Sequence, residues 1–233
     1  MQAAPDIASK PPPLRASRSV TEELLLGFVL GAALAYVFVL ALSVIAANDL
    51  GWQLKTGEII RREGRVPMTD RFSWSAAGER WIVHEWLSNV ALSLLYDYGG
   101  PLVLVLYKAF AAVAVAVLIF LRCCERTGRL WPALGATILA AATLRPYTDV
   151  RPQMTTFVCL AAMMLALDRY RAGEWRWLPR ALPVLFLLWA NLHGGVMIGL
   201  GVLCLWLAGE SAAAAIFRRD GRWLGPLWLA ALA

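Results

Sequence analysis

The stretch NDLGWQLKTGEIIRREGRVPMTDRFSWSAAGERWIVHEWLSNVALSLLYDY, from Asn48 to Tyr98, decides how this chain is organised. It directly follows a long apolar run, and it mixes acidic and basic side chains, tryptophans and one of the two histidines of the sequence. A polar segment of about fifty residues that no membrane span interrupts is uncommon in a compact protein and is usually functional. We therefore expect this segment to form the working face of a membrane enzyme.

The rest of the chain is strongly apolar. Hydrophobic residues make up 60% of the 233 positions and charged residues only 16%, whereas a soluble domain carries roughly 25% charged residues. The composition therefore predicts an integral membrane protein. The formal net charge of +6 comes mostly from short arginine clusters between apolar runs, which indicate membrane topology and not nucleic-acid binding. The four cysteines show neither a metal-binding spacing nor a disulfide framework.

The N-terminal residues differ from everything that follows. Residues 1–20 are rich in proline and polar side chains and lack hydrophobic periodicity, which predicts a disordered cytoplasmic tail. Residues 21–233 are expected to form one transmembrane domain. Its first apolar run, Leu24 to Ala47, exceeds the roughly 7 to 15 residues of a signal-peptide core, so it is expected to remain as a span. Because the chain stops inside an apolar run, we expect it to be the N-terminal part of a longer protein.

Apolar runs that approach the roughly 20 residues of a membrane crossing predict the spans. These runs are Leu24 to Ala47, Pro101 to Leu121, Leu130 to Leu144, Met154 to Leu167 and Ala181 to Phe217, with a further run starting at Trp223. The run from Ala181 to Phe217 corresponds to roughly 55 Å of helix, which is too long for one crossing. We expect a break at Gly194-Gly195.

The segment from Trp86 to Tyr98 is too short and too polar to cross, and Gly99-Gly100 closes it, so we expect an amphipathic helix at the membrane interface. The positive-inside rule then puts the arginine clusters on the cytoplasmic side with the tail. These clusters are Arg122, Arg126 and Arg129; Arg169, Arg171, Arg176 and Arg180; and Arg218, Arg219 and Arg222. The predicted fold class is all-α, a polytopic integral membrane helical bundle whose first extracytoplasmic loop contains juxtamembrane helices.

Three acidic residues on the opposite face are candidate catalytic groups. Asp49 follows the first span, where a carboxylate meets both apolar surroundings and water and is suited to accept a proton. The alternative is that Asp49 only caps the helix that starts at Leu50. Glu85 follows His84, and such a pair can shuttle a proton or bind a phosphate or a metal, although Glu85 is also a favourable residue for a helix start. Any divalent metal would need Asp49 or Asp149 as well.

Polar residues between later spans are candidate substrate-binding groups. Arg145 and Arg151 flank Asp149, and arginine is suited to bidentate recognition of phosphate; the alternative is an ordinary loop. Asn191 and His193 lie at the expected helix break. Polar groups at a broken membrane helix often line a site, but a structural role at the carbonyls that the break frees is the alternative.

The order of these features resembles the GT-C superfamily of membrane glycosyltransferases, which includes protein O-mannosyltransferases and the lipid A aminoarabinose transferase. The features are the acidic residue after the first span, a helix from Asp49 that ends at Gly57, the segment GRVPMTDRFS from Gly64 to Ser73, the HEWL signature from His84 to Leu87, the interfacial helix and the consecutive spans. The resemblance covers nearly the whole chain after Val20, but its motifs are loose. Two departures concern the site: Asn48 replaces one member of the acidic pair common in the family, and His193 stands where some members carry a lysine.

The resemblance implies an enzyme of the bacterial inner membrane with its active face in the periplasm. It implies that a polyprenyl-phosphate carrier donates a sugar to a lipid, glycan or protein acceptor. It places Asp49 as the catalytic aspartate of the first loop and Asp149 as a second acidic residue. A lipid-carbohydrate transporter or an assembly scaffold that only binds in the same place is the alternative. The expected partners are the carrier and membrane lipids, with no nucleic acid, and the sequence assigns neither a metal nor an oligomeric state.

Overall fold

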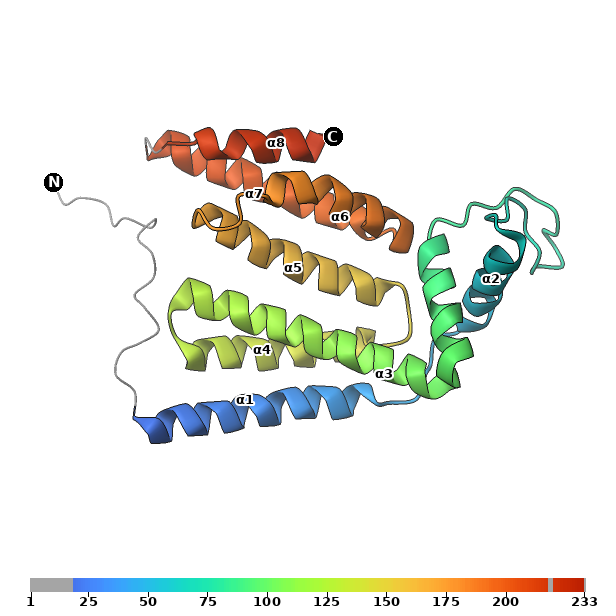
Figure 1. Cartoon of the computed structure of the whole chain (residues 1–233), viewed down its shortest axis with the longest axis horizontal. Coiled ribbons are helices and arrows are strands. Elements are labelled where there is room, and N and C mark those ends of the chain that lie inside the picture. The colour runs from blue at the N-terminus through green and yellow to red at the C-terminus, as the bar shows by residue number, and fades with distance from the viewer. Residues whose placement is uncertain (1–18, 218–219, 233) are drawn as a thin grey trace.

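The computed structural model describes residues 19–217 and 220–232, and every regular element in them is helical (Figure 1). A single antiparallel bridge between Thr69 and Arg80 is the only strand-like pairing within those residues. The predicted all-α class is therefore confirmed. Most of the expected N-terminal tail, residues 1–18, lies outside the described residues, and so do Arg218 and Arg219.

Helix α1, Val20–Ala41, begins with a reciprocal cap. The Ser19 hydroxyl accepts from the Glu22 backbone N–H, and the Glu22 carboxylate accepts from the Ser19 backbone N–H. The helix is apolar around its whole circumference and exposes most of its side chains, as a lipid-facing helix does. Its predicted end at Ala47 was wrong by six residues. The carbonyls of Ser43 and Val44 accept hydrogen bonds from a buried lysine of α3 instead of continuing the helix.

Helix α2, Leu50–Glu63, is longer than expected. It was predicted to end at Gly57, but it continues to Glu63 and stops at Gly64, which has a φ of 66° and closes the helix in the left-handed conformation. Gly57 instead marks a close helix contact, because a Cβ at Gly57 would lie 2.0 Å from the Asn89 carbonyl oxygen of α3. The glycine therefore lets two backbones approach each other.

The loop between α2 and α3 is folded by its own side chains. The Asp70 carboxylate accepts from the backbone N–H groups of Phe72 and Ser73, which closes an Asx-type turn. Trp81 packs between two aromatic rings, with ring centroids 5.8 Å from Trp52 and 5.6 Å from Phe72. These contacts hold the chain just before His84 against α2.

Helix α3, Trp86–Thr127, consists of two parts. Gly99 and Gly100 leave helical geometry, Gly100 with a φ of 63°, and Pro101 opens the second part. Figure 1 shows the first part turned across the direction that the second part shares with α1, α4 and α5. The prediction of a separate short helix up to Tyr98 is confirmed; its position at a membrane interface stays a prediction.

The remaining helices follow the predicted runs closely. They are α4 (Leu130–Leu144), the 3-10 turn η1 (Arg145–Tyr147), α5 (Gln153–Arg171), α6 (Leu178–Leu192), α7 (Val196–Ile216), the 3-10 turn η2 (Arg222–Leu224) and α8 (Gly225–Leu232). The break between α6 and α7 falls at the expected glycines. By length and composition, α1, α3 and α7 are the described helices that can cross a membrane. Helices α4 and α6 have 15 residues each, or about 22 Å.

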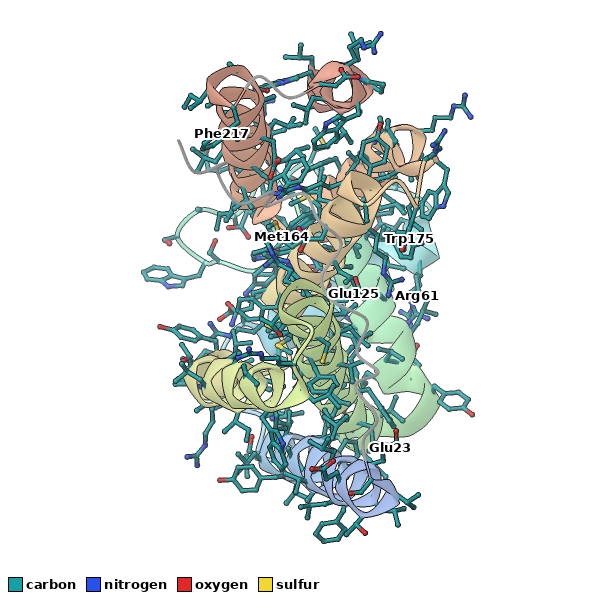
Figure 2. All side chains as sticks on the ribbon, turned by 90° about the vertical axis from the view of Figure 1, so that its left-hand side faces the viewer. Glu23, Arg61, Glu125, Met164, Trp175 and Phe217 are labelled. Atoms are coloured by element: carbon teal, nitrogen blue, oxygen red, sulfur yellow. The ribbon has the colours of Figure 1, made fainter. Side chains whose placement is uncertain are left out.

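The helices pack around two centres. The second part of α3 lies against α1, α4 and α5, while α5, α6, α7 and α8 share a core of leucines that includes the fully buried Leu167, Leu182 and Leu203. Ion pairs join the helices at one end of the molecule, where Arg169 lies 2.7 Å from Glu125 and its guanidinium lies 4.7 Å from the Trp175 ring centroid. Figure 2 views the molecule from this end and labels Glu125 and Trp175.

Candidate functional site

All eight predicted site residues lie at the other end of the molecule. The α1–α2 connection, the α4–α5 connection, the α6–α7 break and the first part of α3 meet there (Figure 1). The residues are Asp49, His84, Glu85, Arg145, Asp149, Arg151, Asn191 and His193. Five of them form two groups with direct side-chain contacts, and the side chains of Asp149, Arg145 and Asn191 lie outside these groups.

The first group pairs Asp49 with Arg151. Asp49 occupies the N-cap position of α2, but its side chain makes no capping hydrogen bond. Its Oδ1 instead lies 3.8 Å from Arg151 Nη2, across 102 positions of sequence, and both side chains are more than a third exposed. The Nε of Arg151 is buried and has no hydrogen-bond partner among the described residues. The carboxylate is therefore available for a role other than capping, and the guanidinium has an unused donor.

Asp149 is held more tightly than Asp49. Its Oδ2 accepts from the Ala46 backbone N–H at 3.1 Å, and its Oδ1 accepts from the Val150 N–H at 2.7 Å. Oδ1 also lies 3.9 Å from the ammonium of Lys108, a fully buried residue in the second part of α3. The catalytic role expected for Asp149 stays a prediction, but its contacts are those of a carboxylate that fixes backbone.

Arg145 has no direct contact with this pair. It is exposed, and it makes no ion pair with any residue that the structure describes. Arg145 lines a cavity of about 450 Å³ whose other walls are mainly apolar side chains of α1 and α4, with Met154 and Phe157 of α5. An arginine thus borders an apolar cavity at the end where Asp49 lies.

The second group brings two histidines to one carboxylate. Glu85 Oε1 lies 3.4 Å from His193 Nε2 and 3.5 Å from His84 Nε2, although His193 comes from the α6–α7 break. The Glu85 side chain is mostly buried, whereas His84 is largely exposed. Gly194 lies beside the His84 ring, where a Cβ would make ordinary contact at 3.7 Å.

A chain of hydrogen bonds orients the His193 ring. The Gly195 backbone N–H can only donate, and it points to His193 Nδ1 at 3.0 Å, so Nδ1 acts as an acceptor. The Thr156 hydroxyl, 2.7 Å away, then donates to the same nitrogen, while Thr156 Oγ1 accepts from the Trp189 indole N–H at 2.9 Å. The neutral ring therefore carries its proton on Nε2, the nitrogen that lies 3.4 Å from Glu85 Oε1.

The arrangement of Thr156, His193 and Glu85 has the connectivity of a nucleophilic triad. Thr156 is only 5% exposed and its oxygen already accepts from Trp189, so a substrate cannot reach it. Of the ionisable groups here, His84 is largely exposed, whereas His193 and Glu85 are only partly exposed. Burial lowers the pKa of His193 below its ordinary value, the Glu85 carboxylate opposes this and the His84 ring adds to it. The chain thus keeps His193 neutral and directed at Glu85.

Asn191 serves the helix break. Its amide donates to the Leu187 carbonyl at 2.7 Å and its Oδ1 accepts from the Trp86 indole N–H at 2.6 Å. Ser88 of α3 donates to the Leu192 carbonyl at 2.6 Å. The Leu192 carbonyl near the end of α6 therefore accepts a hydrogen bond from α3, which ties the first part of α3 to the break. The contacts of Asn191 favour its structural alternative.

No protein-family model, curated protein or solved structure matches this chain. The resemblance noted from the sequence motifs therefore rests on those motifs alone. The features that indicate a function are the Asp49–Arg151 pair, the group of Glu85 with its two histidines, and the cavity beside Arg145.

The divalent metal considered from the sequence has no ligand set in residues 19–217 and 220–232, where no group of three or more His, Cys, Asp or Glu side chains is placed to hold an ion. Sequence reasoning missed three residues of the site: Lys108, Thr156 and Trp189. Lys108 carried a usable signal, because a lone lysine inside an apolar run has to find buried partners. Thr156 and Trp189 look like ordinary helix residues, and only the fold brings them to His193.

Proposed function

We propose that this protein is a polytopic membrane glycosyltransferase that moves a sugar from a polyprenyl-phosphate carrier to an acceptor at the end of the bundle holding Asp49. The acceptor is a lipid, a glycan or a protein. The observation that carries the proposal is the apolar cavity between α1 and α4 with Arg145 at its wall. On α1 the lining residues run from Val29 to Ala41, about 18 Å of helix. A cavity of this kind suits an isoprenoid chain, and a guanidinium suits its phosphate.

Arg151 supports the same assignment. Its guanidinium has an unpartnered buried Nε, and its backbone carbonyl accepts from Met154, a residue of the cavity wall. A phosphate held by Arg145 and Arg151 would lie close to the Asp49 carboxylate. The base and the leaving group of a transfer reaction would then be neighbours.

In the proposed reaction, the acceptor hydroxyl oxygen forms a bond to the anomeric carbon of the sugar. The bond from that carbon to the phosphate oxygen breaks, and its electron pair stays on the departing lipid phosphate. Asp49 takes the hydroxyl proton, and the two arginines stabilise the phosphate charge. Glu85 and the two histidines lie where the start of α3 meets the α6–α7 break, and they are proposed to contact the sugar or the acceptor.

The proposed orientation in the membrane has α1, the second part of α3, α4, α5, α6 and α7 as spans of a bacterial inner membrane, with Asp49 on the periplasmic side. The arginine-rich connections α3–α4 and α5–α6 lie at the end opposite Asp49, which the positive-inside rule assigns to the cytoplasm. Several of these arginines are ion-paired, for example Arg122 with Asp168 at 2.8 Å. The rule counts Lys and Arg and not net charge, so pairing does not weaken the argument.

The test is binding of polyprenyl phosphate to the purified protein. A charge-assisted contact contributes about 1.5 to 3 kcal/mol, so Arg145→Ala and Arg151→Ala should each weaken binding by about 10- to 100-fold. Arg151→Lys keeps the charge but loses the planar fork, and should weaken binding roughly tenfold. The control is Arg80→Ala, which removes an exposed arginine at the same end and should leave the dissociation constant unchanged. An unchanged constant for both alanine variants would refute the carrier site, and binding without any sugar transfer would favour a transporter or scaffold.

A further inference from the structure

The segment that carries Asp49 is not a regular element. Between the end of α1 at Ala41 and the start of α2 at Leu50 the chain has neither helix nor strand. Five of its eight side chains are exposed, and Ile45, Ala47 and Asp49 are half-buried. Ile45 packs with Leu50 against Leu92, Leu104 and Val150. Something outside the segment must therefore fix where Asp49 points.

Lys108 provides the main attachment. Its ammonium group donates to the Ser43 carbonyl at 2.8 Å, to the Ser43 hydroxyl at 3.1 Å and to the Val44 carbonyl at 3.3 Å. An ammonium has three protons, so these three acceptors saturate it. The side chain is fully buried, and a buried charge at this depth is tolerated only with such partners.

Asp149 provides the second attachment and the counter-charge. Its Oδ2 accepts from Ala46, three residues before Asp49, and its Oδ1 lies 3.9 Å from the Lys108 ammonium. Asp149 also precedes Arg151 by two residues, and the Arg151 backbone N–H donates to the Asp149 carbonyl at 2.9 Å. Asp149 is thus bonded to both chain segments that carry the Asp49–Arg151 pair. Its carboxylate accepts from Ala46, and its backbone carbonyl accepts from Arg151.

We propose that Lys108 and Asp149 form a buried clamp that positions Asp49 against Arg151, so that both act on the reaction through Asp49 and neither touches the substrate. This rests on the proposed transfer function for its catalytic consequence, but the clamp itself is a statement about the position of the segment. It gives Asp149 a positioning role in place of direct catalysis. It also explains why a lysine is retained inside a helix that is otherwise apolar.

The position of the segment can be measured without any substrate. Spin labels on Asn48→Cys and Tyr147→Cys, both exposed positions, report the distance between the Asp49 segment and the α4–α5 connection by pulsed electron paramagnetic resonance. The background lacks the four native cysteines. We expect a narrow distance distribution that Lys108→Met and the milder, isosteric Asp149→Asn each broaden. The control Lys55→Met, which removes a lysine paired with Glu58 on the surface of α2, should leave it narrow.

A double variant separates the clamp from a simple loss of stability. Lys108→Met leaves Asp149 as an uncompensated charge, and Lys108→Met with Asp149→Asn removes both charges, so the double variant should recover thermal stability. Its distance distribution should nevertheless remain broad, because the bonds to Ser43 and Val44 are absent. A narrow distribution in Asp149→Asn and in every folded Lys108 variant would overturn the proposal.

The catalytic consequence appears as a split between rate and binding. Misplacement of a reacting group by about 1 Å can cost on the order of 100-fold in rate, so Asp149→Asn should lower the transfer rate by that order while the dissociation constant for polyprenyl phosphate stays unchanged. A parallel loss of lipid binding would instead place Lys108 or Asp149 in contact with the phosphate and would contradict the clamp. If the unmodified protein transfers no sugar, the proposed function fails, and the distance measurement still decides the clamp.

Discussion

At the scale of single residues, the two carboxylates at the site end have different surroundings. Asp49 faces the Arg151 guanidinium, and its side chain does not cap the helix that follows it. Glu85 faces the imidazole rings of His84 and His193. A carboxylate beside a phosphate-binding arginine suits proton transfer next to the leaving group. A carboxylate oriented by a histidine suits the binding of hydroxyl groups. These different surroundings give each residue its own experimental signature.

The first prediction concerns Asp49. Asp49→Asn keeps the shape and the ability to cap α2 but removes the negative charge, so sugar transfer should be lost while the protein still inserts and binds polyprenyl phosphate. The measurement follows labelled sugar from a polyprenyl-phosphate donor into the acceptor fraction of membranes. Full transfer by the Asn variant would remove Asp49 from the mechanism and leave it as the partner of Arg151.

The second prediction concerns the protonation of His193. Since burial lowers its pKa, the folded protein favours the neutral ring, and the stability that this provides is fully present above the unfolded value near 6.5 and is lost as the pH falls through the folded pKa. The chain has only two histidines, so ¹⁵N NMR of labelled imidazoles can resolve both. We expect one ring, assigned by its absence in His193→Gln, to titrate below 6.5 and to carry its proton on Nε2.

The matched variant for that experiment is Thr156→Val. It has a similar shape but removes the hydroxyl that donates to His193 Nδ1, so the proportion of rings protonated on Nδ1 should rise. His84 should be unaffected. If the His193 signal kept its tautomer and its titration in Thr156→Val, the Gly195 N–H alone would orient the ring, and Thr156 would be only a packing residue.

At the scale of elements, glycine and proline residues predicted some helix boundaries correctly. Other helix boundaries were missed for a physical reason. Helix α4 was predicted to the residue, because Gly128 ends the preceding helix and Pro146 follows close behind. The breaks at Gly99-Gly100 and Gly194-Gly195 were predicted in the same way. The end of α1 was wrong because Lys108, distant in sequence, binds the carbonyls that follow Ala41. The end of α2 was wrong because Gly57 serves a close contact with Asn89 of α3, and the helix stops only at Gly64.

The same distinction holds for the site. The sequence predicted which end of the molecule carries the polar residues, since that follows from the number and length of the helices. It could not predict which of those residues touch. Glu85 meets His193 across more than a hundred positions, and Arg145 lines the apolar cavity while Arg151 pairs with Asp49, although the two arginines are close in sequence. Contacts of that kind depend on how α3, α5 and α6 pack.

A prediction at this scale concerns Gly57 in the α2–α3 contact. An alanine Cβ at this position would lie 2.0 Å from the Asn89 carbonyl oxygen and 2.7 Å from Ser93 Cβ, and the two backbones would have to separate. Gly57→Ala should therefore destabilise the protein by about 1 to 3 kcal/mol. Gly51→Ala in the same helix meets nothing within 4 Å and should stabilise it by roughly 0.5 to 1 kcal/mol. Thermal unfolding in detergent compares the two, and equal melting temperatures would mean that α2 is not packed as described.

At the scale of the whole molecule, two networks of charge hold the two ends. Ion pairs between α3, α5 and α7 close the end that Figure 2 faces, including Arg171 with Glu210 at 2.7 Å. The other end is held by the Lys108–Asp149 clamp and by the contacts of His193. The site end also carries cations on α2, among them Arg61, which pairs with Asp97. Because the site end bears arginines too, the orientation that the positive-inside rule assigns calls for a direct measurement.

The last prediction concerns this orientation in the membrane. In a variant without the four native cysteines, Ser75→Cys in the α2–α3 loop and Tyr147→Cys between α4 and α5 should both react with a membrane-impermeant maleimide applied outside spheroplasts. Ala172→Cys, at the end of α5, should react only after the membrane is opened. All three positions are exposed, so a difference in labelling reports the side of the membrane. Ser75 precedes α3 in the chain, and Tyr147 follows α3 and α4. Labelling of Tyr147→Cys only from the cytoplasm would therefore mean that the first part of α3 crosses the membrane as a separate span. Asp49 and Arg151 could then not form one site.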